Sequence, residues 1–158
     1  MEREMVSFVI PCYRSAATIG DVVEEIDKAM QALPAYQYEV ILVNDCSPDD
    51  TFEVIRTLSE TNSRIVGVNL ARNFGQHAAL MAGFHQVKGD ILVCLDDDGQ
   101  TPALEFFSLV DKLLEGYDVV YASYGHKMHN AFRNFGTCMN ERMTESLIGK
   151  PKGLKVTS

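Results

Sequence analysis

The sequence contains no tryptophan and only five prolines, and no apolar run approaches the ~18 residues of a membrane span. The first residues lead directly into a strand-like segment, without the regions of a signal peptide. Positive charge is scarce as well, because 14 Lys and Arg stand against 22 Asp and Glu, for a net charge of -8. This balance argues against a nucleic-acid surface and against electrostatic membrane docking, and it suits a chain that binds cations.

Cysteine is also sparse. Cys12, Cys46, Cys94 and Cys138 lie far apart and form no CxxC or zinc-binding pattern. The first three lie in or beside apolar runs, so we expect buried, reduced thiols in a cytoplasmic protein. With 46% apolar and 23% charged residues in 158, the composition is that of about one globular domain.

Short β-rich runs alternate with segments of helical length. The runs are nearly continuous apolar stretches, typical of strands buried on both faces, and cover residues 6–10, 38–43, 65–70, 91–95 and 119–122. Helices are predicted after a capping box at Thr18, from Asp50, over 76–87, and from Thr101 to about residue 116. This order predicts a parallel α/β sheet with helices on both faces, in which ligands bind beyond the carboxyl ends of the strands.

The pattern changes from Tyr124 onward. Apolar residues recur at helical spacing and predict one amphipathic helix with a packing stripe, formed by Phe132, Phe135, Met139, Met143 and Leu147. The chain stops at Ser158 without a closing element. We therefore expect an α/β domain over residues 1–123 and the truncated start of a helical region over 124–158.

Polar and aromatic residues follow the first three predicted strands. Pro11 is expected to stop sheet pairing and Tyr13 can lie against a planar ligand, although an ordinary turn explains this segment equally well. Asp45 is placed to accept a hydrogen bond from a ligand, whereas the Asp49–Asp50 pair fits a turn and a helix cap. Arg72 suits either phosphate binding or bracing of the acidic residues.

The acidic run Asp96-Asp97-Asp98 after the fourth strand is the strongest feature. Three adjacent carboxylates repel one another unless a positive group lies among them. Alternate residues of an extended chain point the same way, so Asp96 and Asp98 can act together while Asp97 turns aside. Hard oxygen ligands suit Mg²⁺ or Mn²⁺ completed by ligand phosphates, and a solvated acidic loop is the alternative. Together the strand ends predict a nucleoside-diphosphate site without a GxGxxG or GxxxxGK[ST] loop.

These motifs resemble the nucleotide-binding half of the family 2 glycosyltransferases with the GT-A fold, most closely the branch that transfers sugars to polyprenyl phosphates. The resemblance covers about residues 5–125 and rests on residues 9–13, 43–51, 72–83 and 96–102. It implies a Rossmann-like, mostly parallel sheet, incomplete at the C-terminus. The implied nucleotide-sugar-binding residues are Pro11, Tyr13, Val43, Asp45, Arg72, Asp96 and Asp97. The implied metal ligands are Asp98, Gln100 and Asp96.

Several positions depart from the family pattern. Arg14 and Ser15 replace an Asn and a Glu that often follow the Pro-x-Tyr motif. Asn44 replaces the first acid of an Asp-Asp pair. The arginine that is common after the fifth strand is missing, and His126 or Lys127 can substitute for it as a phosphate-facing cation.

The resemblance implies a metal-dependent glycosyltransferase that uses Mg²⁺ or Mn²⁺. We expect a nucleoside-diphosphate sugar as donor, with UDP preferred, and an acceptor such as a polyprenyl phosphate, in cell-wall biosynthesis at the cytoplasmic face of a membrane. The general base, and any membrane contact, are expected beyond Ser158. The alternatives are a non-catalytic nucleotide-binding module and an aspartate-based phosphoryl-transfer protein. A homodimer through the exposed sheet edges or the tail helix stays open.

Overall fold

The structure of the protein is a computed structural model that describes residues 4–99 and 106–121. By its internal contacts the chain divides into two units, Met1–Ser108 and Leu109–Ser158. The first unit holds the sheet and the strand ends. In the second unit the structure describes residues 109–121, which include most of helix α4 (Phe106–Leu114). The predicted domain boundary after residue 123, the tail helix and the His126–Lys127 pair lie outside the described residues.

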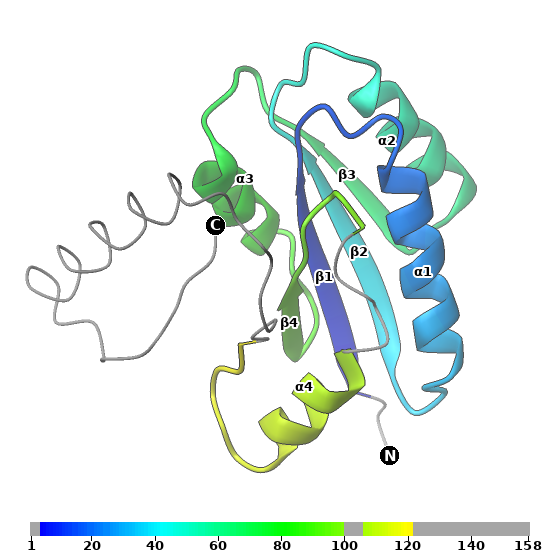
Figure 1. Ribbon diagram of the computed structural model, residues 1–158, viewed down its shortest axis with the longest axis vertical. Helices are drawn as coiled ribbons and strands as arrows, with labels where there is room; N and C mark the ends of the chain where they lie inside the picture. The colour runs from blue at the N-terminus through cyan, green and yellow to red at the C-terminus, as the bar shows by residue number, and fades with distance from the viewer. Residues whose placement is uncertain (1–3, 100–105, 122–158) are drawn as a thin grey trace, which may run out of the picture. The chain divides into compact units, whose positions relative to one another are not determined.

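Four parallel strands form the sheet (Figure 1). They are β1 (Met5–Cys12), β2 (Gln37–Asn44), β3 (Ile65–Asn69) and β4 (Ile91–Cys94). Their order is β3-β2-β1-β4, so the chain builds outward from β1 in one direction and then crosses to its other side. The strand order reverses direction at β1, and sheets of this kind bind ligands outside the carboxyl ends of the strands at such a point.

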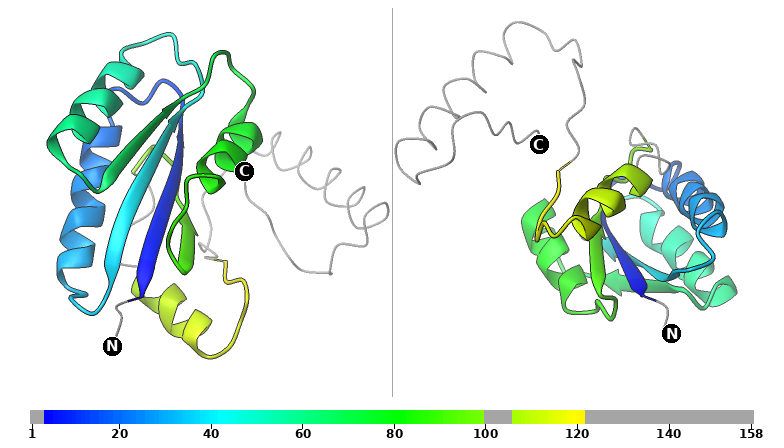
Figure 2. Two further views of the ribbon diagram at one scale, coloured as in Figure 1. Left: turned by 180° about the vertical axis from the view of Figure 1, so that it is seen from behind. Right: turned by 90° about the horizontal axis from the view of Figure 1, so that it is seen from below.

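Helices cover both faces of this sheet, as the alternating pattern predicts. Helices α1 (Ile19–Gln31) and α2 (Thr51–Thr61) lie on one face, and α3 (Gln76–Phe84) lies on the other (Figures 1 and 2). Under α3 the core is formed by Val9, Ile41, Val43 and Ala79, all fully buried. The close fit of α3 over β1 and β2 is possible because Gly83 has no side chain at the contact.

The prediction of strands buried on both faces holds for the two central strands and is wrong for the edges. Every residue of β1 from Val6 onward is buried, whereas burial alternates along β3 and β4. Helix α3 packs on β1 and β2, and Leu92 in β4 is 43% exposed. The expectation of buried thiols is confirmed for Cys12 and is wrong for Cys46, in the loop after β2, and for Cys94, which are both exposed. Cys138 lies outside the described residues.

Some element ends differ from the predicted ones. Thr18 occupies the N-cap of α1 but makes no side-chain capping bond, so the predicted capping box does not form. Helix α3 ends at Phe84, since the N–H groups of the next turn bond to carbonyls three residues back. Residues 119–121, predicted to begin a fifth strand, are not in a strand. Among the described residues, the helices are too short or too polar to cross a membrane.

Candidate functional site

Pro11 and Val43 lie side by side in the sheet, just below its carboxyl edge. Both are buried, and Val43 is fully so. The sequence predicts that Pro11 stops the sheet pairing, and this prediction is wrong. Strands β1 and β2 remain paired through Cys12 and Asn44. On the side of β1 that faces β4, the last residue pair is Val9 with Cys94. The pairing with β4 therefore ends before Pro11, and the missing N–H of the proline breaks no hydrogen bond there. The side chain of Val43 packs in the core beneath α3.

Asp45, directly after β2, is held by the loop that follows β3. Its two carboxylate oxygens accept hydrogen bonds from the backbone N–H groups of Phe74 and Gly75, each at 2.8 Å. Its own N–H donates to the carbonyl of Cys12 at 3.0 Å. The residue is only 4% exposed. Asp45 therefore ties the loop after β2 to the loop after β3 and to the end of β1, and each of its carboxylate oxygens accepts one main-chain hydrogen bond.

The loop after β1 is fastened by side chains from two other loops. Each of four consecutive backbone N–H groups donates to such a side chain: Tyr13 to Asp97 (3.1 Å), Arg14 to Ser47 (2.8 Å), Ser15 to Thr51 (2.9 Å) and Ala16 to Asp49 (3.4 Å). Two non-glycine residues of these loops adopt the left-handed conformation, Arg14 with φ of 60° and Cys46 with φ of 51°. Such conformations persist only where surrounding contacts hold them, and they cluster at functional sites.

Asp49 organises the turn before α2, as the sequence predicts. Its carboxylate accepts hydrogen bonds from the hydroxyls of Ser47 and Thr51. These donors lower the pKa of Asp49 to about 2. Asp50 occupies the helix N-cap without a side-chain capping bond. Sequence reasoning missed Ser47 and Thr51, and the signal was available in the alternation of hydroxyl, carboxyl and hydroxyl groups over residues 47–51.

Residues 97 and 98 of the acidic loop after β4 lie in a turn and not in the extended chain from which the alternation was predicted. Asp97 turns toward the loop after β1, where its carboxylate accepts hydrogen bonds from the Tyr13 N–H and the Ser15 hydroxyl. Its carbonyl accepts one from the Thr18 hydroxyl at 2.7 Å. Asp96 and Asp98 are exposed, and the Gln76 amide donates to Asp96 at 3.4 Å. Gln100 lies outside the described residues.

Two arginine–aromatic pairs stand at the same edge. The guanidinium of Arg14 lies 5.6 Å from the ring centre of Tyr13, and that of Arg72 lies 4.7 Å from the ring centre of Phe74. Tyr13 and Phe74 are 45% and 50% exposed. Flat aromatic surfaces beside positive charge suit a planar base and an anionic group. Phe74 was not among the residues expected from the sequence.

Cys12 provides no nucleophile for this site. Its thiol is buried and donates to the carbonyl of Ile10 at 3.4 Å. Burial raises its pKa well above the usual range, and the negative charge of Asp97 adds to the shift. A thiol held in the protonated form is unreactive.

The donor set at the edge fits a hard divalent cation completed by ligand oxygens. Over residues 4–99 and 106–121, no cluster of three or more His, Cys, Asp and Glu side chains is arranged to hold a metal by itself. Asp96 and Asp98 instead offer exposed carboxylates on two sides of Asp97. Mg²⁺ sites commonly use one or two carboxylates together with substrate phosphates.

Known proteins share this sequence pattern. The family described as Glycosyl transferase family 2 matches residues 7–156. Undecaprenyl-phosphate 4-deoxy-4-formamido-L-arabinose transferases from Yersinia enterocolitica and Pseudomonas fluorescens are each 40% identical to the chain, over 149 and 153 residues. The alignments cover 94% and 96% of this chain but 45% and 43% of those proteins. The chain thus spans less than half the length of these relatives.

Solved structures share the fold. A mannosyltransferase from Pyrobaculum calidifontis in complex with GDP-Man and Mn²⁺ superposes with a TM-score of 0.62 at 25% identity, over 85% of this chain and 39% of that one. A glucosyl-3-phosphoglycerate synthase from Mycobacterium tuberculosis in complex with Mn²⁺, UDP and phosphoglyceric acid superposes with a TM-score of 0.56 at 27% identity, over 72% of this chain and 40% of that one. These likenesses bear out the expected GT-A architecture.

Proposed function

The chain belongs to glycosyl transferase family 2, and from this premise we propose that it forms the donor-binding part of a metal-dependent glycosyltransferase. The donor is a nucleoside-diphosphate sugar, and the acceptor is a polyprenyl phosphate. The observation that carries the proposal is the carboxyl edge itself, where the half-exposed ring of Tyr13 and the exposed Asp96 and Asp98 are tied into one set of loops. The donor-binding domain is assigned to residues 1–123.

Each part of the edge takes one portion of the donor. The ring of Tyr13 stacks on the base, next to the ends of β1 and β2 that carry Pro11 and Val43. Asp98, assisted by Asp96 and Gln100, holds Mn²⁺ or Mg²⁺. The metal, when bound, stabilises the negative charge of the departing diphosphate. Arg72 lies on the β3 side and adds positive charge for the phosphates.

The nature of donor and acceptor is supported by relatives. One structural neighbour at 27% identity holds UDP and Mn²⁺, and another at 25% holds GDP-Man and Mn²⁺. We choose UDP and make GDP the competing outcome of the test. The relatives at 40% identity are named as transferases of undecaprenyl phosphate, which supports a polyprenyl phosphate acceptor. With an acceptor of this kind, the proposed site of glycosyl transfer is the cytoplasmic face of a membrane.

Calorimetric titration of UDP and of GDP into the 158-residue chain tests the donor site. Each titration is run with and without Mn²⁺, on the wild type, on Asp98→Ala and on the control Asp111→Ala, an exposed aspartate of α4. We expect Mn²⁺ to tighten UDP binding in the wild type and the control, and Asp98→Ala to lose most of this gain. Absence of nucleotide binding at any metal concentration would refute the proposal, and tighter binding of GDP would correct the base.

A non-catalytic nucleotide-binding module predicts the same titration but no chemistry. The two are separated by incubating the chain with UDP-sugars, Mn²⁺ and a short-chain polyprenyl phosphate, and measuring release of UDP. Release that needs both metal and acceptor supports a transferase. Metal-dependent binding without release supports the module for this chain.

A further inference from the structure

Asp97 accepts three hydrogen bonds from the segment between β1 and α1. Its carboxylate accepts hydrogen bonds from the Tyr13 N–H at 3.1 Å and from the hydroxyl of Ser15. Its carbonyl accepts one from the hydroxyl of Thr18 at 2.7 Å. We call these three bonds the Asp97 latch. It joins two segments more than 75 residues apart in the chain, since the three contacts span 84, 82 and 79 residues.

The latch lies between the two groups of residues that the donor needs. Tyr13 is the aromatic residue at one end, and the carboxylates of Asp96 and Asp98 flank Asp97 at the other. The chain turns at Asp97 and Asp98, and Gly99 continues the turn with φ of 66°. Because both the side chain and the carbonyl of Asp97 are held, the directions of its two neighbours relative to Tyr13 are fixed.

We propose that Asp97 is a positioning residue that couples the nucleoside end of the site to its metal end. This inference rests on the proposed function. A nucleoside diphosphate has a limited length. Its phosphates would therefore reach a metal ion held by the carboxylates of Asp98 and Asp96 only when these carboxylates lie at a set distance from the base. A rigid latch supplies that distance in advance, whereas a loose one makes the ligand order the loop at the expense of affinity.

The latch is best broken from the side of the loop after β1, because all three carboxylates then remain. In Ser15→Ala/Thr18→Val the two hydroxyl donors are gone and the charge at the edge is unchanged. Thr18 makes no capping bond to α1, so its replacement removes no helix cap. Thr18→Val alone, at a partly exposed position, carries the test if the buried Ser15 position does not tolerate alanine.

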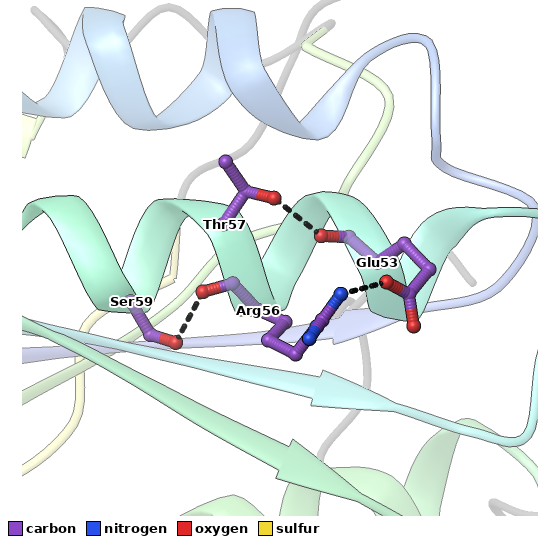
Figure 3. Close-up of polar contacts among 4 residues, drawn as sticks. All are labelled: Glu53, Arg56, Thr57 and Ser59. Atoms are coloured by element: carbon purple, nitrogen blue, oxygen red, sulfur yellow. Dashed lines mark hydrogen bonds and ion pairs between the residues drawn. The ribbon is translucent and has the colours of Figure 1, made fainter.

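Helix α2 offers a matched control. Figure 3 shows the hydroxyls of Thr57 and Ser59 donating to the carbonyls of Glu53 and Arg56, at 2.9 and 2.8 Å. The control Thr57→Val/Ser59→Ala therefore also removes a threonine and a serine hydroxyl that bond to oxygen atoms. It does so inside a helix rather than between the loops of the edge. Thr18→Ser keeps a hydroxyl at the latch and serves as the conservative variant.

The measured quantity is the ratio of the UDP dissociation constants without and with Mn²⁺, obtained by calorimetry on the 158-residue chain. A general loss of structure weakens both constants alike and leaves the ratio unchanged, whereas loss of coupling lowers the ratio. We expect Ser15→Ala/Thr18→Val to lower the ratio about tenfold, within the usual range of coupling between sites. Thr18→Ser and the α2 control are expected to keep the wild-type ratio.

One result would overturn the inference while leaving the proposed function intact. It is a wild-type ratio in the latch variants, whether both dissociation constants stay unchanged or weaken equally. A wild type that binds no UDP or GDP with Mn²⁺ would instead remove the proposed function, and the inference with it. A ratio lowered in the latch variants and restored in Thr18→Ser would establish the coupling.

Discussion

Gly83 sets how closely α3 approaches the sheet, and alanine at this position tests that packing. A Cβ atom there would lie 2.4 Å from Cγ1 of Val9 and 3.1 Å from Cγ2 of Val43. Both valines are fully buried, and a branched side chain has no flexible end that can move aside. The helix would have to shift away from β1 and β2, or the valines would leave their preferred rotamers.

Gly20 in α1 is the matched control, because a Cβ atom there meets nothing within 4 Å. Alanine favours a helix over glycine by up to about 1 kcal/mol at either position. Overpacking of a core typically costs about 1–3 kcal/mol. We therefore expect Gly83→Ala to lower the free energy of unfolding by roughly 1–2 kcal/mol. Gly20→Ala should raise it by at most about 1 kcal/mol.

Urea unfolding at 25 °C, followed by far-ultraviolet circular dichroism, measures both variants against the wild type. The slope with urea should stay constant, so that a shifted midpoint reports stability alone. Equal stability of Gly83→Ala and Gly20→Ala would refute the close approach of α3 to β1 and β2. Since α3 also carries Gln76, whose amide reaches Asp96, a shifted helix should weaken nucleotide binding in Gly83→Ala as well.

Three further predictions concern single groups. Cys46 is exposed and has a left-handed backbone conformation. Cys46→Gly should therefore leave the free energy of unfolding unchanged or raise it by up to about 1 kcal/mol, whereas the β-branched Cys46→Val should lower it. Urea unfolding measures both variants. Burial and a 2.6 Å hydrogen bond to Asp27 raise the pKa of Tyr38 from 10.0 to about 12. Its stabilising contribution is thus complete below pH 10 and lost through pH 12, and an alkaline absorbance titration should lose its last phase in Tyr38→Phe. The pKa of Asp49, lowered from 3.8 to about 2, gives stability that is present above pH 3.8 and lost as pH falls through 2. Carbon NMR of its carboxyl should show the low pKa, and Ser47→Ala should raise it.

The order of the elements and the residues that follow each strand could be predicted from the sequence, because both depend on local patterns. Nearly continuous apolar runs identified β1 and β2, and alternation with helical segments predicted a parallel sheet with helices on both faces. The Asp96-Asp97-Asp98 run indicated a candidate site after the fourth strand, because adjacent carboxylates repel one another unless a positive group lies among them. The turn role of Asp49 was also predicted and is confirmed. Asp97 turns aside as predicted, although the chain forms a turn there and not the extended segment from which this was inferred.

Other features depended on contacts between segments far apart in the chain. Among the described residues β3 and β4 are the outer strands and α3 packs on β1 and β2, and Cys94 of β4 is exposed although its neighbours are apolar. Pro11 fits inside a strand because β4 stops short of it. Neither could be found from a window of adjacent residues, because each depends on which strand lies alongside.

The sequence by itself determined which chemical groups stand after each strand. Only the tertiary structure decided which of them bind one another. Asp45 and Asp97 look alike in the sequence as acceptors for a ligand, yet one is taken up by the N–H groups of Phe74 and Gly75 and the other by the loop after β1. The physical reason is that four converging loops leave backbone donors without helix or strand partners, and buried donors must be satisfied by whatever acceptor the fold brings near. Carboxylates near a crowded edge therefore divide between holding the loops and facing the solvent.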